Sequence, residues 1–519
     1  MEIILLNFNF FVAFILCYKK IRQGLHILQL ENYYNDRYLK WIKDNFKNIF
    51  RIKEVILLII TILISFINIK LGLCLNILVL LCFTLIFKRK KEKKPFVVTS
   101  RIKRKYITLL IIFGCIVYIG NTINFSLSLI LINIFIILAH LLVYLVNIIN
   151  KPIEESIKFK FINRAKNKLK ENRNLQVLGI TGSYGKTSTK HMIEAVLSKK
   201  FHTLMTPESY NTTMGVVRTI NENLRPTNNL FICEMGAKYK GDIKQICDIV
   251  KPKYAVLTAI GPQHLDTFKA LENVAKTKLE LIDSLPEDGI CFVNWEDENI
   301  RNAKIEKKMV KYGLSNNADY YADNIKISEK GSDFDVITPD KKIINIRTRL
   351  LGKLNILNIV SAVAVADTLG MDVEQIKLGA KTIKPVEHRL QLKQNINGSI
   401  IIDDAYNSNI KGAKNAIDVL SEFKDRKRIL ITPGIVDLGE KQYEINKEFG
   451  KHAATGTDFV ILVGQKPAVP LKDGLIEAKY PEEKIYIAKN LDDALNKMNQ
   501  IMDEKSVVLL ENDLPDNYL

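Results

Sequence analysis

The chain has 519 residues, a length that predicts two to four domains. Its formal net charge of +19 would suit a nucleic-acid partner, but its lysines and arginines cluster between apolar runs, which membrane topology explains better, so no nucleic acid is expected. The seven cysteines show no metal-like CxxC spacing, and nothing in their placement requires disulfides, so a reducing compartment fits the soluble part.

Residues 1–150 are predicted to form a transmembrane region of about five helices. Apolar runs cover residues 3–17, 55–69, 71–87, 106–120 and 125–149, of which the first two are short for a membrane span. Basic residues crowd segments 18–53 and 88–105, whereas the turns near 70–72 and 121–124 are almost uncharged. By the positive-inside bias, this pattern predicts a multi-pass protein of the cell membrane, in contact with the lipid bilayer and with everything after residue 150 in the cytoplasm.

After residue 150 the chain is predicted to be an α/β protein that follows a basic helical linker over residues 151–174. Residues 175–384 alternate strands and helices, which predicts a central α/β domain with a mostly parallel sheet and strands at 177–180, 230–234, 254–259, 290–294 and 342–346. The phosphate-loop sequence described next makes this domain P-loop ATPase-like. A hinge at 384–390 leads into a C-terminal, Rossmann-like domain over residues 385–519, with strands at 399–402, 428–431, 459–463, 484–487 and 507–510.

Segment 176–190 has the sequence of a phosphate-binding loop. A buried strand is followed by glycines at a spacing of three, beginning with Gly179, and then by a lysine, a threonine and a helical run over 188–197. Glycines let backbone N–H groups turn toward a polyphosphate, the lysine reaches the β- and γ-phosphates, and the threonine hydroxyl can ligate magnesium. A Gly-rich turn before a solvated lysine is the alternative, but the order strand–loop–helix favours phosphate binding. The predicted contacts are Gly182, Ser183, Gly185, Lys186, Thr187 and Ser188.

Two further strands end in residues that can ligate a metal. Glu234 closes the strand over 230–234, and His264 and Asp266 follow the strand over 254–259. A strand end beside a phosphate loop is where the magnesium of a nucleotide needs an oxygen ligand, so Glu234 is predicted to be one. For His264 the alternative is a helix cap or a packing residue, and metal ligation is favoured over it.

The segment 270–285 is predicted to be an amphipathic helix with a lysine in its apolar stripe. Leu271, Val274, Leu281 and neighbouring apolar residues recur at helical spacing, and Lys278 falls on the same face, whereas Lys276 points elsewhere. A lysine on a buried face has a lowered pKa and becomes a neutral, nucleophilic amine. Alternatively its ammonium snorkels to water, and periodicity alone does not separate the two interpretations.

Five ordered segments together resemble the Mur ligases, which use ATP to make peptide bonds in bacterial cell-wall precursors. These segments are residues 182–190, 234–236, 261–265, 275–280 and 403–409. The resemblance covers about residues 175–465 and is nearest to the branch that joins a UDP-N-acetylmuramoyl-tripeptide to D-alanyl-D-alanine. It implies the substrates of peptidoglycan synthesis as partners, ATP and two magnesium ions as cofactors, and a role in cell-wall biogenesis and cell shape.

The resemblance also implies roles for individual residues. Lys186 would hold the ATP phosphates, Thr187 and Glu234 one magnesium, and His264 a second. Lys278 would be carbamylated by CO2 and become a metal-binding anion. The residues implied around the rest of the nucleotide are Asn294 and Asn358 at adenine, Arg389 at the γ-phosphate, Asp404 at the ribose, and Tyr406, Asn407 and Asn409 in the motif beside it.

The implied mechanism is carboxylate activation. The carboxylate of the peptide attacks the γ-phosphorus of ATP, and the incoming amine then attacks the resulting acyl phosphate. Lys186, Lys278, His264 and Arg389 would be the catalytic residues, with charge on the transferring phosphoryl group offset by cations.

This chain departs from the family pattern in several places. A membrane region stands where family members begin with a soluble UDP-binding domain, His388 precedes the hinge arginine where glycine is common, and Glu511 begins a stretch that replaces a Lys-Gly-Ser-Arg sequence. Two alternatives therefore stay open beside the cell-wall ligase. One is a ligase acting on another carboxylate, such as a lipid-linked precursor or a γ-glutamyl or pseudomurein-type peptide. The other is a membrane-tethered P-loop ATPase, against which the 403–409 motif and Lys278 argue.

Overall fold

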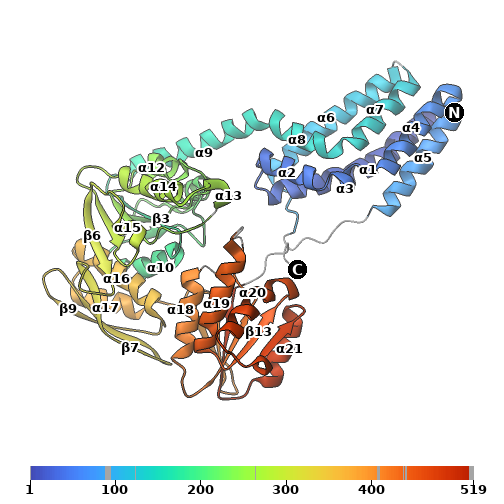
Figure 1. The fold of residues 1–519 in the computed structure, drawn as a ribbon. Helices are drawn as coiled ribbons and strands as arrows, with labels where there is room; N and C mark the ends of the chain where they lie inside the picture. Colours follow the sequence, from blue (N-terminus) through green and yellow to red (C-terminus); the bar gives the residue numbers. More distant parts are fainter. Residues whose placement is uncertain are drawn as a thin grey trace. The chain divides into compact units, whose positions relative to one another are not determined.

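The structure is a computed structural model that describes residues 2–87, 95–122, 124–263, 265–405, 410–436, 438 and 441–512. It divides into two compact units, residues 1–159 and 160–519, each described here by itself. The first unit is helical, and the second contains two β-sheets covered by helices (Figure 1).

The helical unit has a single apolar core, in which Leu16, Leu25, Leu73 and Ile132 are fully buried. Asn68 and Asn124 cap two of its helices, each accepting a hydrogen bond from a backbone N–H in the first turn. The helices of this unit in the described residues are α1 (Glu2–Leu30), α2 (Asn35–Asp44), α3 (Phe46–Ile49), α4 (Ile52–Ile67), α5 (Ile69–Ile86), α6 (Ser100–Thr122), α7 (Phe125–Ile137), α8 (Ala139–Ile149) and the beginning of α9 (Lys151–Glu171).

The prediction of a five-span, multi-pass membrane protein is wrong. In the described part of the chain, only α1 and α5 are single helices long and apolar enough to cross a membrane. The bent pair α7–α8 makes a third candidate if it counts as one span. The apolar run 55–69 becomes α4, which has only 16 residues, and the run 106–120 belongs to α6, whose first turns are basic. The run 125–149 is divided into two helices bent by 80°. An apolar run therefore does not by itself define a straight helix of membrane length.

The larger sheet of the second unit has the strand order β2-β3-β1-β4-β5-β6-β7-β8-β9. Pairing is parallel from β2 to β7, and β7, β8 and β9 form an antiparallel extension. The strands are β1 (Gln176–Thr181), β2 (Thr203–Met205), β3 (Leu230–Glu234), β4 (Tyr254–Leu257), β5 (Ile290–Asn294), β6 (Lys308–Gly313), β7 (Tyr320–Ser328), β8 (Gly331–Ile337) and β9 (Ile343–Thr348). The predicted parallel-rich α/β fold is confirmed, although the sequence interpretation missed β2, β6, β7 and β8.

Helices cover both faces of this sheet, so its central strands are buried on both sides. One face packs against α10 (Lys186–Leu197), α16 (Lys353–Thr368) and α17 (Val373–Lys381). The other packs against α11 (Thr213–Asn223), α12 (Asp242–Val250) and α14 (Leu271–Asp283), while α13 (Leu265–Phe268) and α15 (Glu298–Arg301) are short helices after β4 and β5. The second half of α9 also joins this second layer, with Ala165 fully buried and Lys168 Nζ donating to the Asn221 carbonyl oxygen at 2.7 Å.

The smaller sheet has the order β10-β11-β15-β12-β13-β14, parallel except for β10. Its strands are β10 (Gln391–Gln394), β11 (Ile400–Asp404), β12 (Lys427–Thr432), β13 (Phe459–Val463), β14 (Ile485–Ala488) and β15 (Ser506–Glu511). The helices of this part are α18 (Ile410–Ser421), α19 (Gln442–Gly456), α20 (Gln465–Glu477) and α21 (Leu491–Ile501). All five strands predicted here are present, and the short edge strand β10 was missed.

Candidate active site

The predicted phosphate loop lies between β1 and α10, as the sequence indicated. Gly182 and Gly185 have φ values of 152° and 81°, a region that favours glycine. A Cβ on Gly182 would lie 2.1 Å from Thr258 Oγ1, so a larger residue would displace the neighbouring strand end. Ser183 braces the loop, since its hydroxyl donates to the Gly261 carbonyl oxygen at 2.9 Å and accepts from the Gly261 N–H at 3.0 Å.

Lys186, the first residue of α10, bends back over this loop. Its Nζ donates to the Gly182 carbonyl oxygen at 2.6 Å and to that of Ser183 at 3.3 Å. Burial lowers the pKa of Lys186 to about 8, with Glu234 acting in the opposite direction. The amine is thus held at the mouth of the loop, where a polyphosphate would be cradled.

Glu234 and Thr187, two of the predicted metal ligands, are in direct contact. The register of β1 and β3 places Glu234 opposite Ile180, next to the loop. Thr187 Oγ1 donates to the Glu234 carboxylate, with oxygen–oxygen distances of 3.0 and 3.2 Å. One carboxylate and one hydroxyl beside a phosphate loop suit magnesium, which takes few protein oxygens and completes its shell with phosphate and water.

The predicted metal set also includes His264 and Lys278. His264 lies outside the described residues, and among the residues described no group of three or more His, Cys, Asp or Glu side chains could hold a metal. Two residues without a predicted role complete the surroundings of Glu234. Asn211 donates to its Oε1 at 2.9 Å, and Lys190 lies 3.2 Å from its Oε2. For Lys190 a signal was available, because it shares the buried helical stripe of Ile193 and Leu197.

The predicted burial of Lys278 is confirmed. On α14 the Lys278 side chain is 1% exposed, between the buried Val274 and Leu281, whereas Lys276 is exposed. Burial, reinforced by the nearby Lys186 ammonium, holds the pKa of Lys278 well below its usual value. The snorkelling alternative is therefore excluded, and the amine is favoured in its neutral form.

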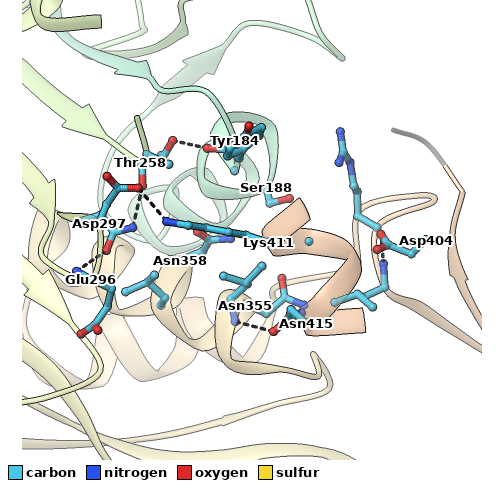
Figure 2. A pocket seen from close by; sticks show the side chains of 18 residues that line it. Tyr184, Ser188, Thr258, Glu296, Asp297, Asn355, Asn358, Asp404, Lys411 and Asn415 are labelled. Atoms are coloured by element: carbon cyan, nitrogen blue, oxygen red, sulfur yellow. Dashed lines mark hydrogen bonds and ion pairs between the residues drawn. The ribbon is translucent and has the colours of Figure 1, made fainter. Parts of the chain in front are cut away.

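A cavity of about 330 Å³ extends from the phosphate loop to the C-terminal part of this unit (Figure 2). It brings together residues far apart in the sequence that were predicted to contact the nucleotide, namely Gly185, Ser188, Asn294, Asn358, Arg389 and Asp404. Tyr406, Asn407 and Asn409 lie outside the described residues. Further lining residues without a predicted role are Tyr184, Asp297, Asn355, Lys411 and Asn415.

The polar groups of the cavity are held by specific hydrogen bonds. Asn294 Nδ2 donates to the Thr258 carbonyl oxygen at 2.8 Å, and Asn358 Oδ1 accepts from Thr189 Oγ1 at 3.1 Å. Asp404 Oδ1 accepts from the Leu390 N–H at 3.1 Å. Burial raises the pKa of Asp404 to about 6, against the opposing charge of Arg389.

One ion pair crosses this cavity. Lys411, at the start of α18, reaches Asp297 in the loop after β5, with Nζ and Oδ2 3.2 Å apart (Figure 2). The Asp297 side chain is 1% exposed and also caps α15 by accepting from the Ile300 N–H. The two walls of the cavity are therefore joined by a charged contact that sequence reasoning did not find.

The hinge before Asp403 explains one departure from the family pattern. His388 has φ 57° and Leu390 φ 48°, both in the left-handed region where glycine is favoured. The His388 ring compensates by pairing with Asp403, with Nδ1 and Oδ2 2.9 Å apart. At the end of β15, Glu511 is fully buried and accepts from Thr432 Oγ1 at 2.9 Å.

Comparison with known families agrees with this geometry. Residues 180–366 match the Mur ligase middle domain, and residues 388–511 match the Mur ligase, glutamate ligase domain. Neither match reaches the helical unit, so the comparisons also give no support to the predicted membrane location.

Named relatives have similar identities over parts of the chain. The UDP-N-acetylmuramoyl-tripeptide–D-alanyl-D-alanine ligase of Escherichia coli is 31% identical over 308 residues, covering 58% of this chain and 68% of the relative. The UDP-N-acetylmuramate–L-alanine ligase of Dictyoglomus turgidum is also 31% identical, over 344 residues, covering 64% and 71%.

Solved structures show the same fold. A crystal structure of MurF from Acinetobacter baumannii superposes with a TM-score of 0.60 at 25% identity, covering 68% of this chain and 76% of that one. MurF from Thermotoga maritima in complex with ADP gives a TM-score of 0.60 at 24% identity, covering 68% and 80%. The chain belongs to the Mur ligase family and is an ATP-dependent ligase.

Proposed function

We propose that the chain adds D-alanyl-D-alanine to a muramoyl-tripeptide in cell-wall precursor synthesis. The observation that carries this proposal is the cavity of Figure 2, which joins the phosphate loop to Arg389 and Asp404. The D-alanyl-D-alanine ligases among the relatives support this choice of substrate. The L-alanine ligase is as similar in identity, so the acceptor must be tested directly.

In this proposal the peptide carboxylate attacks the γ-phosphorus of ATP. The bond between that phosphorus and the β,γ-bridging oxygen breaks, which gives an acyl phosphate and ADP. The amine of the dipeptide then attacks the acyl carbon, loses a proton and expels inorganic phosphate. Lys186 and Arg389 would offset the charge of the phosphoryl group as it transfers.

Magnesium would be held by Thr187 and Glu234, whose oxygens are already in contact, and His264 would help to hold a second ion. Bound there, the metal would offset negative charge on the phosphate oxygens. The residues fit the ion, because the carboxylate of Glu234 is buried beside the phosphate loop and faces a hydroxyl group.

Lys278 would supply a further anion. Its neutral amine would form a bond to the carbon of CO2 and release a proton, which leaves a carbamate where the protein has a lysine. Burial supports this step, since only the unprotonated amine is nucleophilic. The carbamate would place a negative charge close to the Lys186 ammonium.

Phosphate release by the full-length chain, with ATP and magnesium, tests the proposal across pairs of acceptor and amine. We expect release to need both a muramoyl-tripeptide and D-alanyl-D-alanine, with ligated product appearing in equal amount. Release driven by L-alanine and the unextended UDP-muramate would assign the other branch. Release that needs no amine would overturn peptide ligation altogether.

A second candidate, the same chemistry with a different incoming amine, is favoured by one observation. The buried Glu511 carboxylate stands at the start of the stretch that replaces a Lys-Gly-Ser-Arg sequence in the D-alanyl-D-alanine branch. A carboxylate in place of a cation would change which charged amine this end of β15 accepts. The same screen, extended to amino acids with a cationic side chain, decides between the two.

A further inference from the structure

We propose that Lys190 is a positioning residue for magnesium, and that together with Asn211 it fixes the orientation of the Glu234 carboxylate. The inference rests on the proposed magnesium site at Thr187 and Glu234. It assigns Lys190 no contact with substrate or nucleotide.

Lys190 is a fully buried cation on α10, one helical turn after Lys186. Its side chain is 0% exposed, and its Nζ lies 3.2 Å from Glu234 Oε2. The same amine donates a hydrogen bond to the Glu208 carbonyl oxygen. A buried charge persists only where it is paired and hydrogen-bonded, so these two contacts account for the burial of Lys190.

Two of the partners of Glu234, Asn211 and Lys190, contact different oxygens of its carboxylate. Asn211 Nδ2 donates to Oε1 at 2.9 Å, and Lys190 holds Oε2. With one donor on each oxygen, rotation of the carboxylate about its last bond is blocked. Thr187 Oγ1 is nearly equidistant from the two oxygens, at 3.2 and 3.0 Å, so the free side of the carboxylate faces the threonine hydroxyl.

Lys190 also joins the loop after β2 to the end of β3. The same loop holds the end of β3 by two further hydrogen bonds. Thr206 Oγ1 accepts from the Glu234 N–H at 3.1 Å, and the Asn211 carbonyl oxygen accepts from the Gly236 N–H at 2.7 Å. Backbone and side chain of Glu234 are thus fixed by the same segment. Partners outside the ligand shell that orient a metal-bound carboxylate commonly change metal affinity by about 10- to 100-fold when they are removed.

Magnesium dependence of nucleotide binding tests this role without relying on turnover. The full-length chain is titrated with a fluorescent ATP analogue in EDTA and then at increasing magnesium concentration. For Lys190→Met we expect binding in EDTA to stay within about twofold of the unmodified chain, while the magnesium concentration at half-effect rises by about tenfold or more. Lys190→Gln keeps a donor without the charge and should lie between the two.

The controls separate failure of this inference from failure of the proposed site. Lys199→Met removes the same charge just beyond the end of α10 and should leave the magnesium dependence unchanged, whereas Thr187→Ala should lose it. If Thr187→Ala loses the magnesium dependence and Lys190→Met keeps it unchanged, Lys190 has no positioning role and the magnesium site stands. If neither variant changes the magnesium dependence, the magnesium site itself is wrong. Should Lys190→Met unfold, Asn211→Ala, which removes the other tether, must raise the magnesium requirement, and an unchanged requirement would overturn the inference.

Discussion

Three lysines beside the phosphate loop differ in chemistry because their surroundings differ. Lys186 is bonded to loop carbonyls, Lys190 is paired with Glu234, and Lys278 is buried close to the positive charge of Lys186. Desolvation disfavours the charged form of each, but only for Lys190 does a carboxylate within contact distance compensate. Of the three lysines, Lys278 therefore loses its proton most readily and is the one most favoured as a neutral amine.

Lys278→Ala is expected to lower the ligation rate by on the order of 10²-fold, the effect typical of removing one preorganised group from a transition state. Added short carboxylates should restore part of the rate by replacing the carbamate. Lys276→Ala, on the exposed side of the same helix, should be nearly silent. The measurement is the steady-state ligation rate of the two variants, with and without formate or acetate. Equal rates for the two variants would contradict the inference that Lys278 acts from the buried, apolar face of α14.

Asp404 is predicted to make stability depend on pH. Burial raises its pKa to about 6 in the folded state from a usual value of 3.8, so the folded chain binds the proton more tightly than the unfolded chain. The stabilisation is fully present below about pH 4 and is lost as the pH rises through 6. Asp404→Asn stays neutral at every pH. Its free energy of unfolding should therefore exceed that of the unmodified chain by up to about 1 kcal/mol at pH 7.5 and should equal it at pH 4. The difference is small because the side chain is only half-buried.

The neighbouring Asp403 provides a control of opposite sign. Burial acts to raise its pKa, but hydrogen bonds from Lys393 and His388 outweigh this and hold the pKa below its usual value. Its contribution is present at neutral pH and is lost as the pH falls. Asp403→Asn should thus be destabilised at pH 7.5. Thermal unfolding of both variants at two pH values gives the answer, and shifts of the same sign at pH 7.5 would contradict it.

At the scale of the elements, Gly179 has a different role from the one its spacing indicated. It lies inside β1 and does not reach the phosphate loop. A Cβ there would be 2.6 Å from Leu281 Cδ1 and 3.0 Å from Met235 Cε. The absence of a side chain lets α14 approach the sheet closely, and α14 carries Lys278.

Gly179→Ala should destabilise the chain by about 1–3 kcal/mol, because the added methyl overpacks the interface between β1 and α14. Shortening the opposing residue with Leu281→Val should recover part of this loss in the double variant. Denaturant unfolding of the two single variants and the double variant measures the coupling. Strictly additive effects would show that the two side chains do not compete for the same space.

The sequence predicted the buried parallel strands well and the other elements less well. Strands β1, β3, β4 and β5 are continuous apolar runs beside glycine or polar turns, a local signal that survives folding. In the antiparallel extension, β7 and β9 mix buried and exposed residues, so their pattern is weaker, and only β9 of the three strands was predicted. In the helical unit, apolar content predicted helices but not their lengths or the bend at Leu138.

The site was predictable where chemistry is local in sequence and less so where folding brings distant segments together. Lys186, Thr187 and Glu234 follow from a strand–loop–helix motif and an adjacent strand end. The contact of Lys411 with Asp297 joins residues 114 positions apart, and no periodicity connects them. Asn211, likewise, reaches Glu234 from a loop whose path the sequence does not indicate.

At the scale of residues 160–519 as a whole, the cavity of Figure 2 is lined by elements from both α/β parts. β5 and α16 form one wall, and β11 and α18 form the other, with Lys411 extending between them (Figure 2). The ion pair between the walls therefore consists of Asp297 from the first wall and Lys411 from the second. Domain closure around ATP, which excludes water from the acyl phosphate, would be reinforced by this contact.

Lys411→Met is therefore expected to raise the KM for ATP by about three- to fivefold while kcat stays within about twofold. The effect is modest because the Lys411 side chain is 61% exposed, which screens the pair, although the partner carboxylate is 1% exposed. Asp297→Asn keeps the helix cap and removes the charge, so it should match Lys411→Met, and the double variant should be no worse than either. Lys414→Met, one turn further along α18, removes the same charge without this partner and should leave KM unchanged. An ATP titration of the four variants provides the measurement, and a lower KM in Lys411→Met would show instead that the lysine obstructs the nucleotide.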